Sequence, residues 1–335
     1  MTEPERFDVA ILGGGPAGQA AAIALEGHGL SIAVIDEQIR PGGQILRQPP
    51  AGFTVANWLA DRSYAPLKRQ LDRFGRLKGL SWLGGHSAIG LQAGSIVASG
   101  PDGMRTIAAD RILIAAGCQD LAVPLPGWTL PGVYAAGGIQ AFIKSQQLLA
   151  GTRVLLAGTH PLQLIIAAQI VAAGGTVAAV LFAQPRTAMI GALARHPLVA
   201  LGRASDLFAA GGAMATLARA GTPVRYGIDL SALTGRDRVS GATTSVDDIE
   251  CDAVGLCYGF VPQSALPRMV GARMVAAGPA GGWACAHDDW MRTSVPGLYA
   301  AGETVGVAGA AAAAAGGELA GLGIALDLGL LDADA

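Results

Sequence analysis

Apolar and polar positions alternate in blocks near the start of the chain. Val9 to Leu12 form a short continuous apolar run, an alanine-rich stretch of helical character follows Gly18, and Ser31 to Ile35 form a second apolar run. Short continuous apolar runs predict buried strands of a parallel sheet. The order strand, turn, helix, strand over about residues 7 to 47 therefore predicts one βαβ unit.

The same order recurs further along the chain. Thr152 to Ala157 and Thr176 to Leu181 have the pattern of strands, Pro161 to Ala173 has that of a helix, and Gly158 lies at the turn. A stretch rich in proline and glycine, Pro124 to Gly132, precedes this second unit and indicates a domain boundary. The sequence therefore predicts an α/β fold with two Rossmann-like dinucleotide-binding domains.

The first turn carries the glycine fingerprint of dinucleotide binding, Gly13-Gly14-Gly15-Pro16-Ala17-Gly18. Gly13 allows the tight turn, Gly15 lets the backbone approach a diphosphate, and Gly18 lets helix and strand pack closely. The N-terminus of a helix adds unpaired N–H groups and a positive dipole end. We expect Pro16 and Ala17, at the start of the helix, to belong to the same site.

Acidic residues end the strand that follows. Asp36 lies eighteen residues after Gly18, near the spacing of a carboxylate that binds ribose hydroxyls, and Glu37 comes next. Gly42, Gly43 and Gln44 follow as a loop with little side chain. Such a loop is often an ordinary surface turn, but its position after the acids favours contact with the cofactor.

A further glycine ends the strand Arg111 to Ala115. Ala116 and Gly117 come at its carboxyl end, the edge where open α/β sheets bind ligands. The alternative is that Gly117 only turns the chain.

Composition narrows the class of protein. The chain has 335 residues, of which 51% are hydrophobic and 14% charged, with a net charge of −2 and no basic block, so nucleic acid is not an expected partner. The N-terminus lacks the pattern of a secretory signal, and the most apolar stretch, Leu164 to Phe182, is interrupted by Gln169 and two glycines. We expect a cytoplasmic protein without a transmembrane segment.

The four cysteines are scattered. No Cys-x-x-Cys pair occurs, so the cysteines indicate reduced thiols and no metal site. His287-Asp288-Asp289 could indicate a metal ligand or a base, but a polar loop before the last strand explains these residues as well. We identify no catalytic acid, base or nucleophile. The cysteines are Cys118, Cys251, Cys257 and Cys285.

Several segments together resemble the FAD/NAD(P)-dependent flavoproteins of the thioredoxin-reductase and glutathione-reductase superfamily. The resemblance implies a discontinuous FAD-binding domain, residues 1–118 and 283–335, with an NAD(P)-binding-like domain inserted at 119–282. It also implies that Gly302 and Glu303 contact the flavin, Glu303 through the ribityl chain. Alternatively, Glu303 is a first-turn carboxylate stabilised by a helix dipole. The segments are the Gly13–Gly18 turn, Pro41–Gln44, Ala115–Gly117 and Tyr299–Glu303.

Longer segments are similar to the flavoprotein α-type subunit of heteromeric opine and hydroxyproline dehydrogenases and of hydrogen cyanide synthase. The similarity implies an FAD-binding subunit of a multi-subunit amino-acid or opine-type (amine) dehydrogenase, which acts on CH–NH donors and relays electrons. It implies an amino-acid-oxidase-like flavin partner and a small Cys-rich iron–sulfur partner, because no cysteine follows Cys285 to hold a [2Fe-2S] cluster on this chain. The segments are Pro41–Arg47, Pro126–Val133, Tyr258–Pro262 and Gly306–Gly309.

Two departures from the superfamily limit the function. Without a Cys-x-x-Cys pair, the disulfide relay of thioredoxin reductase is excluded. The second turn, Gly158 to Gln163, keeps only its first glycine, and His160 stands where bare backbone would meet a diphosphate. We therefore expect no working NAD(P)H site. Two alternatives stay open: a self-sufficient NAD(P)H-dependent flavin oxidoreductase, and a nucleotide-binding scaffold subunit.

Overall fold

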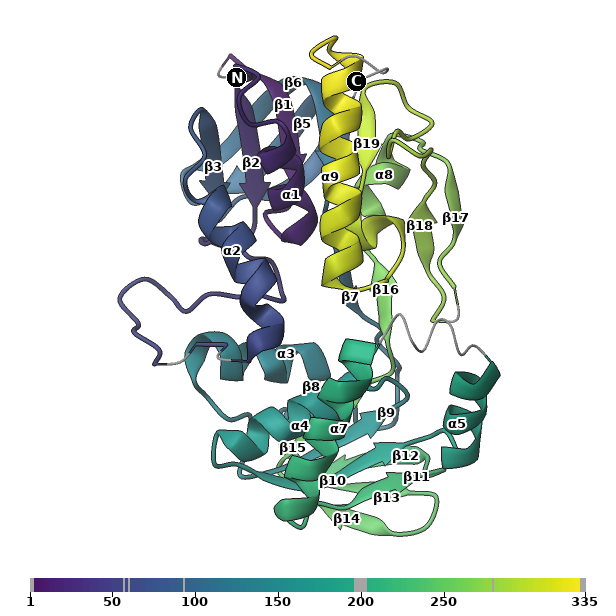
Figure 1. The fold of residues 1–335 in the computed structure, drawn as a ribbon. Helices are drawn as coiled ribbons and strands as arrows, with labels where there is room; N and C mark the ends of the chain where they lie inside the picture. The colour runs from purple at the N-terminus through teal and green to yellow at the C-terminus, as the bar shows by residue number, and fades with distance from the viewer. Residues whose placement is uncertain are drawn as a thin grey trace. The chain divides into compact units, whose positions relative to one another are not determined.

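The chain divides into two units, each built around a sheet with parallel strands (Figure 1). A computed structural model describes residues 3–56, 58–59, 61–92, 94–195, 204–278 and 280–331. Unit 1 comprises Met1–Gln48, Leu59–Gln119 and Phe260–Ala335, and unit 2 comprises Pro49–Trp58 and Asp120–Gly259. The mixed α/β architecture confirms the predicted fold class.

The sheet of unit 1 has the strand order β3-β2-β1-β6-β5-β4, with β19 also paired to β6. β3, β2, β1, β6 and β19 are parallel, whereas β5 and β4 continue antiparallel from the first half of β6. The strands are β1 (Glu5–Leu12), β2 (Ile32–Asp36), β3 (Leu80–Gly84), β4 (Ser87–Gln92), β5 (Ser95–Gly100), β6 (Gly103–Ile114) and β19 (Leu298–Ala300).

The rest of unit 1 consists of helices and short strands. β7 and β16 pair with each other, and β17 and β18 form a second two-stranded sheet. These elements are α1 (Pro16–Ala24), the 3₁₀ turn η1 (Arg62–Tyr64), α2 (Ala65–Phe74), β7 (Cys118–Asp120), β16 (Phe260–Pro262), α8 (Ala265–Met269), β17 (Met274–Ala276), β18 (Trp283–Cys285), the 3₁₀ turn η3 (Gly302–Val305) and α9 (Ala310–Asp327).

Unit 2 contains a five-stranded parallel sheet, β11-β10-β9-β15-β8, and a three-stranded antiparallel sheet, β12-β13-β14. Its elements are β8 (Val133–Ala135), α3 (Ala136–Ala141), the π-helical turn η2 (Phe142–Gln146), β9 (Arg153–Gly158), α4 (Leu162–Ala172), β10 (Thr176–Phe182), α5 (Arg186–Arg195), α7 (Ala204–Arg219), β11 (Val224–Tyr226), β12 (Leu230–Gly235), β13 (Val239–Thr244), β14 (Asp248–Glu250) and β15 (Ala253–Cys257).

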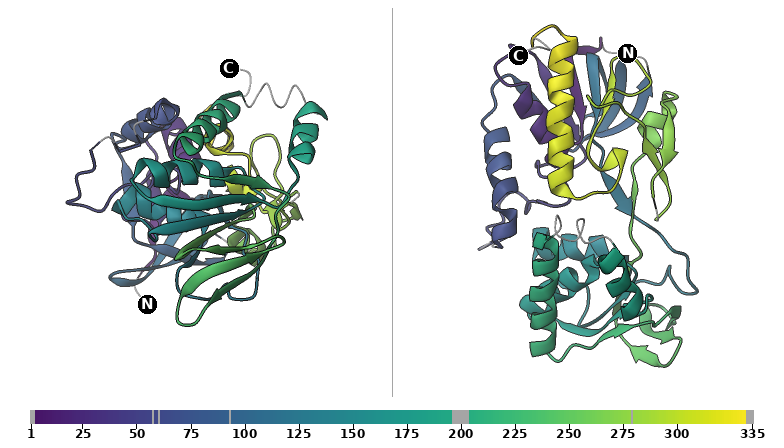
Figure 2. Two further views of the ribbon diagram at one scale, coloured as in Figure 1. Left: turned by 90° about the horizontal axis from the view of Figure 1, so that it is seen from below. Right: turned by 45° about the vertical axis from the view of Figure 1, so that its right-hand side comes forward.

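The helices α1 and α9 lie side by side on one face of the sheet of unit 1 (Figures 1 and 2). A Cβ atom at Gly317 would lie 2.0 Å from the carbonyl oxygen of Ala17, and one at Gly321 would lie 2.7 Å from that of Ala21. Small residues on α9 therefore permit backbone contact with α1. Within the described residues, α9 is the helix long and apolar enough to cross a membrane, and this packing accounts for its composition.

Candidate cofactor site

The turn between β1 and α1 presents bare backbone at a helix N-terminus. Gly15 is the N-cap of α1, with φ −78° and ψ −172°, and no side chain caps the helix through a hydrogen bond. Pro16, the first helical residue, has no N–H to satisfy. The N–H groups of Ala17 and Gly18 thus point out of the first turn without a capping side chain, which is the arrangement that binds anions.

Two glycines make this turn possible. Gly13 has φ +111°, and a Cβ atom there would lie 2.3 Å from the carbonyl oxygen of Ala115; a Cβ atom at Gly18 would lie 1.9 Å from that of Gly13. No side chain fits at either position. The roles predicted for these two glycines, the tight turn and the close packing, agree with these contacts.

The loop around Gly42 and Gly43 lies against the glycine turn. The N–H of Gly42 donates to the carbonyl oxygen of Gly14 over 2.9 Å. Gly43 has φ +60°, and a Cβ atom there would lie 2.9 Å from the Cα atom of Gly15, whereas Gln44 is exposed. These two segments of bare backbone, Gly13–Gly18 and Gly42–Gly43, therefore lie against each other with no room for a side chain between them, and we call them the glycine cradle.

Asp36 supports the cradle through the backbone. Its Oδ2 accepts from the N–H of Gly14 over 2.6 Å and its Oδ1 from that of Gln38 over 2.7 Å. Burial raises the pKa of this carboxyl, and the two backbone donors oppose the rise. Each carboxylate oxygen keeps a second lone pair, so the predicted contact with a ribose stays available. Glu37 is exposed.

The carboxyl ends of β6 and β19 complete the same edge. Ala115 donates to Leu12 over 2.8 Å and Ala301 to Ile114 over 3.0 Å. Gly302 has φ +69°, and a Cβ atom there would lie 2.8 Å from the Cβ atom of Ala17. The chain therefore brings residues from both of its ends to the start of α1.

The two residues after Ala115 leave space at this edge. Ala116 is exposed, and Gly117 has φ +75° with no atom within 4 Å of its Cβ position. The predicted contacts of Ala116, Gly117, Gln44 and Glu37 with a cofactor stay predictions.

Glu303 contacts a residue that the sequence alone does not connect to it. The Sγ atom of Cys118 donates to Oε2 of Glu303 over 2.8 Å, and both residues are half-buried. A thiol S–H can donate a hydrogen bond, and a carboxylate oxygen accepts one. The thiol is thus the donor, and it orients the carboxylate.

Among the described residues, three buried side-chain polar atoms of unit 1 have no hydrogen-bond partner. They are Nε of Arg47, Nε2 of His86, and Oγ1 of Thr304, which directly follows Glu303. Buried polar groups are nearly always paired, so the Arg47 and Thr304 atoms, which belong to segments beside the glycine turn, fit a polar ligand. Together with the cradle, they fit a dinucleotide with an anionic diphosphate. Neither Arg47 nor Thr304 is among the site residues predicted from the sequence. The signals that point to them are the position of Arg47 at the end of the Pro41–Arg47 segment and that of Thr304 next to Glu303.

The corresponding turn of unit 2 is arranged differently. Nδ1 of His160 accepts from the N–H of Leu162, the first residue of α4, over 3.2 Å. Burial lowers the pKa of His160, so the imidazole is neutral and suited to accept. Gln163 is fully buried in place of the third glycine, and neither amide atom has a partner among the described residues. The imidazole thus uses a donor that a diphosphate would need.

None of the four cysteines, all of which lie in the described residues, is in a disulfide. Burial raises the pKa of the Cys251 and Cys285 thiols to about 11 and that of Cys257 to about 12. Thiols with such values are inert at neutral pH. Three of the four thiols are therefore unreactive, and the sequence contains no Cys-x-x-Cys pair.

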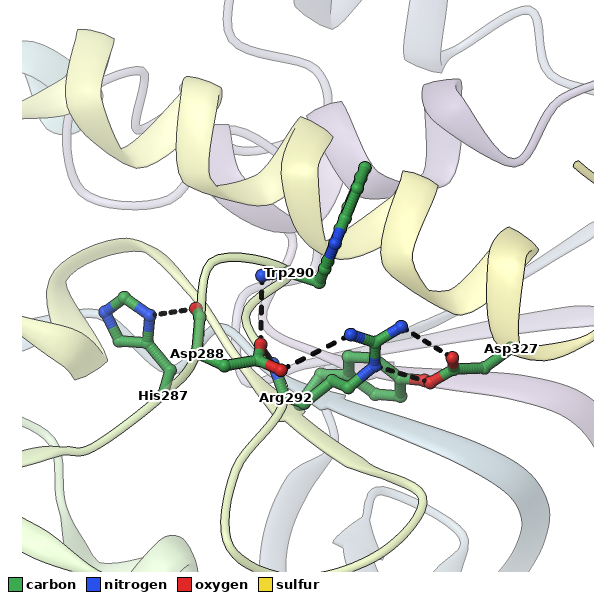
Figure 3. A network of polar contacts seen from close by, with 6 residues as sticks. His287, Asp288, Trp290, Arg292 and Asp327 are labelled. Carbon is green, nitrogen blue, oxygen red and sulfur yellow. Dashed lines mark hydrogen bonds and ion pairs between the residues drawn. The ribbon is translucent and has the colours of Figure 1, made fainter. Parts of the chain in front are cut away.

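The polar loop at His287 is part of a network that fixes α9 (Figure 3). Arg292 donates to Asp327 through Nε over 2.9 Å and through Nη2 over 2.7 Å, and to Asp288 over 3.3 Å. Tyr299 donates a hydrogen bond to the same Asp327 carboxylate. Asp288 and Arg292 thus attach the loop to the end of α9, which supports the structural interpretation of this segment.

Comparisons with known proteins identify the family of this chain. Residues 7–317 match the family model described as pyridine nucleotide-disulphide oxidoreductase. The chain is 30% identical to the hydrogen cyanide synthase subunit HcnB of Pseudomonas protegens, over 97% of this chain and 71% of that protein. It is 31% identical to an opine oxidase subunit of Rhizobium meliloti, over 96% of this chain and 72% of that protein.

Solved structures share the fold. The L-proline dehydrogenase of P. horikoshii has a TM-score of 0.69 at 20% identity. The match covers 98% of this chain and 57% of the dehydrogenase chain. The thioredoxin reductase of T. acidophilum has a TM-score of 0.68 at 21% identity. The match covers 97% of this chain and 99% of the reductase chain. The predicted resemblance is confirmed: the chain belongs to the pyridine nucleotide-disulphide oxidoreductase family of flavin-dependent oxidoreductases.

Proposed function

We propose that the chain is the FAD-binding subunit of a multi-subunit, flavin-dependent amino-acid or opine-type dehydrogenase. The observation that best supports binding of FAD is the start of α1, which has no side-chain cap and lies against the Gly42–Gly43 loop. FAD would supply the electron transfer that the side chains identified in the site do not offer. The residues proposed to hold it are Gly13, Gly15, Pro16, Ala17, Gly18, Asp36, Glu37, Gly42, Gly43, Gln44, Ala116, Gly117, Gly302 and Glu303.

In domain terms, we assign residues 1–118 and 283–335 to the FAD-binding domain and 119–282 to the inserted NAD(P)-binding-like domain. Unit 1 resumes at Phe260, so residues 260–282 cluster with the proposed FAD-binding part. The pairing of β17 with β18 contributes to this clustering, because it joins Met274–Ala276, before the assigned boundary, to Trp283–Cys285, after it.

The proposal of a multi-subunit complex draws on the relatives. HcnB and the opine oxidase chain both carry the word subunit in their names. The sequence has no Cys-x-x-Cys pair to pass electrons to a disulfide. We therefore infer a cytoplasmic complex in which an amino-acid-oxidase-like flavin subunit oxidises a CH–NH donor and a small Cys-rich subunit holds a [2Fe-2S] cluster.

We also propose that unit 2 does not use NAD(P)H as a hydride donor. The cap that His160 forms on α4 supports this, because it fills the place of bare backbone. The fold of unit 2 alone favours the alternative, a self-sufficient NAD(P)H-dependent flavin oxidoreductase, since β9, α4 and β10 repeat the dinucleotide-binding order.

The test is coexpression of this chain with the products of adjacent genes, purification through a tag on this chain, and absorbance spectra under anaerobic conditions. We expect copurified oxidase-like and Cys-rich chains, and bleaching of the flavin by an opine or amino acid but not by NADH or NADPH. Rapid bleaching of the isolated chain by NADH would establish the self-sufficient enzyme instead. Bound nucleotide with no reducible flavin would indicate the scaffold subunit.

A further inference from the structure

Arg47 is a cation with a buried nitrogen that no protein acceptor pairs. Its Nε atom is buried and makes no hydrogen bond within the described chain. Asp36 is close enough for the charge of Arg47 to act on its carboxyl, where burial raises the pKa and Arg47 opposes the rise. The Asp36 oxygens, however, accept from the N–H groups of Gly14 and Gln38. Asp36 thus gives Arg47 a nearby charge and leaves its Nε unpaired.

The backbone places Arg47 beside the glycine cradle. Leu46 donates to the carbonyl oxygen of Gly42 over 3.2 Å, and Gly42 donates to Gly14. On the other side of Arg47, the side chain of Gln48 donates to the carbonyl oxygen of Pro41 over 2.8 Å. The loop is therefore closed on both sides of Arg47 and fixed to the turn that begins α1.

Two independent features of this region thus call for an anion. One is the helix N-terminus without a side-chain cap, and the other is a guanidinium with a buried, unpaired N–H. Leaving a buried donor of a charged group unpaired is unfavourable, and guanidinium groups match phosphate oxygens in geometry and charge. An anionic phosphate group would accept hydrogen bonds both from the N–H groups at the start of α1 and from the guanidinium of Arg47.

We propose that Arg47 binds the diphosphate of the flavin dinucleotide and is the side chain by which the site recognises phosphorylated over phosphate-free ligands. This inference rests on the proposed function, since it assigns a residue to the same cofactor site. It separates the tasks within the site: the glycines give access to the backbone, and Arg47 gives the charge.

The experiment uses the full chain stripped of flavin, as wild type, Arg47→Gln, Arg47→Lys and the control Arg76→Gln, which removes an exposed arginine of unit 1. FAD and riboflavin are titrated by flavin fluorescence, and ADP and adenosine are used as competitors. We expect Arg47→Gln to weaken FAD and ADP by about 10- to 100-fold, as for a charge-assisted hydrogen bond. Riboflavin and adenosine should bind unchanged.

Two further readouts protect the test against a folding defect. Arg47→Lys keeps a charge but not the fork of donors, so its loss for FAD should be intermediate. For the wild type, added NaCl should weaken competition by ADP and leave adenosine unaffected, because salt screens only the charged ligand.

The inference is overturned if Arg47→Gln binds FAD and ADP as the wild type does, if it loses riboflavin to the same extent as FAD, or if wild-type binding of ADP is insensitive to salt. A wild type that takes up neither FAD nor ADP would overturn the proposed function as well. Wild-type binding of FAD with an unaffected Arg47→Gln variant would overturn this inference alone.

Discussion

The two strand–turn–helix units of this chain differ at the first residues of their helices. In unit 1, the N-cap of α1 is a glycine and no side chain caps the helix. Around this turn, a Cβ atom at Gly13, Gly18 or Gly43 would lie within 3 Å of neighbouring backbone atoms, so no side chain fits there. In unit 2, the N–H of Leu162 at the start of α4 is taken by His160, and Gln163 replaces the glycine that would allow close packing. The comparison teaches that the same backbone order leaves the N–H donors of a helix N-terminus open in one unit and occupies one of them in the other, according to the residues that precede the helix.

The largest effect is expected for Gly18→Ala, which removes the bare surface from unit 1. The added Cβ would lie 1.9 Å from the carbonyl oxygen of Gly13, so the turn must shift. We expect the free energy of unfolding to fall by about 3 kcal/mol and bound flavin to be lost. Urea unfolding followed by circular dichroism and the flavin content of the purified protein measure both.

The matched control for this variant is Gly211→Ala in α7, where no atom lies within 4 Å of the added Cβ. There alanine should stabilise the helix by about 0.5–1 kcal/mol. Equal effects at the two glycines would show that contact with Gly13 is unimportant.

The next effect is expected for Gly43→Ala, which places a methyl group between the two bare segments. Alanine at φ +60° is strained, and its Cβ would lie 2.9 Å from the Cα atom of Gly15. We expect a loss of about 1–2 kcal/mol in stability and of about 10-fold in FAD affinity, measured by flavin titration. Gly27→Ala has the same kind of strain, with φ +86°, but open space around it, so it should lose stability and keep FAD affinity.

A smaller effect is expected for His160→Ala, which removes the cap of unit 2. At pH 7.5 the loss in stability should be about 1 kcal/mol. Because the pKa of His160 is lowered in the folded state, the unfolded state binds more protons below about pH 6.5. The wild type should therefore lose this contribution as the pH falls from about 6.5 to the folded-state pKa, and the variant should not.

Urea midpoints of both proteins at about pH 7.5 and about pH 5.5, on either side of the ordinary histidine pKa, give the measurement. A difference between them that is the same at both pH values would contradict the role of the neutral imidazole. The flavin affinity of unit 1 serves as an internal control and should not change.

The smallest effect is expected for Cys118→Ala, which removes the donor to Glu303. FAD affinity should fall by about 3-fold, as for one hydrogen bond to a carboxylate at a half-exposed position. Cys118→Ser keeps a donor and should retain most of the affinity. If serine and alanine gave the same titration curve, the hydrogen bond would have no part in binding.

The local patterns of the sequence predict the strands and turns that build the fold. The apolar runs at Val9 and Ser31 and the glycines between them follow from short-range rules, and the structure has β1, α1 and β2 there. The hydrogen bond of His160 to the start of α4 is equally local, because the two residues are neighbours in the sequence and a side chain stands in place of a glycine.

The remaining contacts join residues far apart in the sequence. Cys118 and Glu303 are 185 residues apart and meet through the placement of β7 and η3, which periodicity does not encode. The spacing of Asp36 predicts a bond to ribose, and the structure adds its bonds to Gly14 and Gln38. Those depend on how the turn folds back over the strand, a detail that spacing alone does not give.

The contact of Gly302 and Gly317 with Ala17 has a consequence for biosynthesis. A ribosome makes the first glycine turn early, but the opposite wall of that turn follows about 285 positions later, at Gly302. The nascent chain therefore holds one half of the nucleotide fold without its counterpart until that segment has emerged. Capture of a prosthetic group at this turn must wait for both halves to be made.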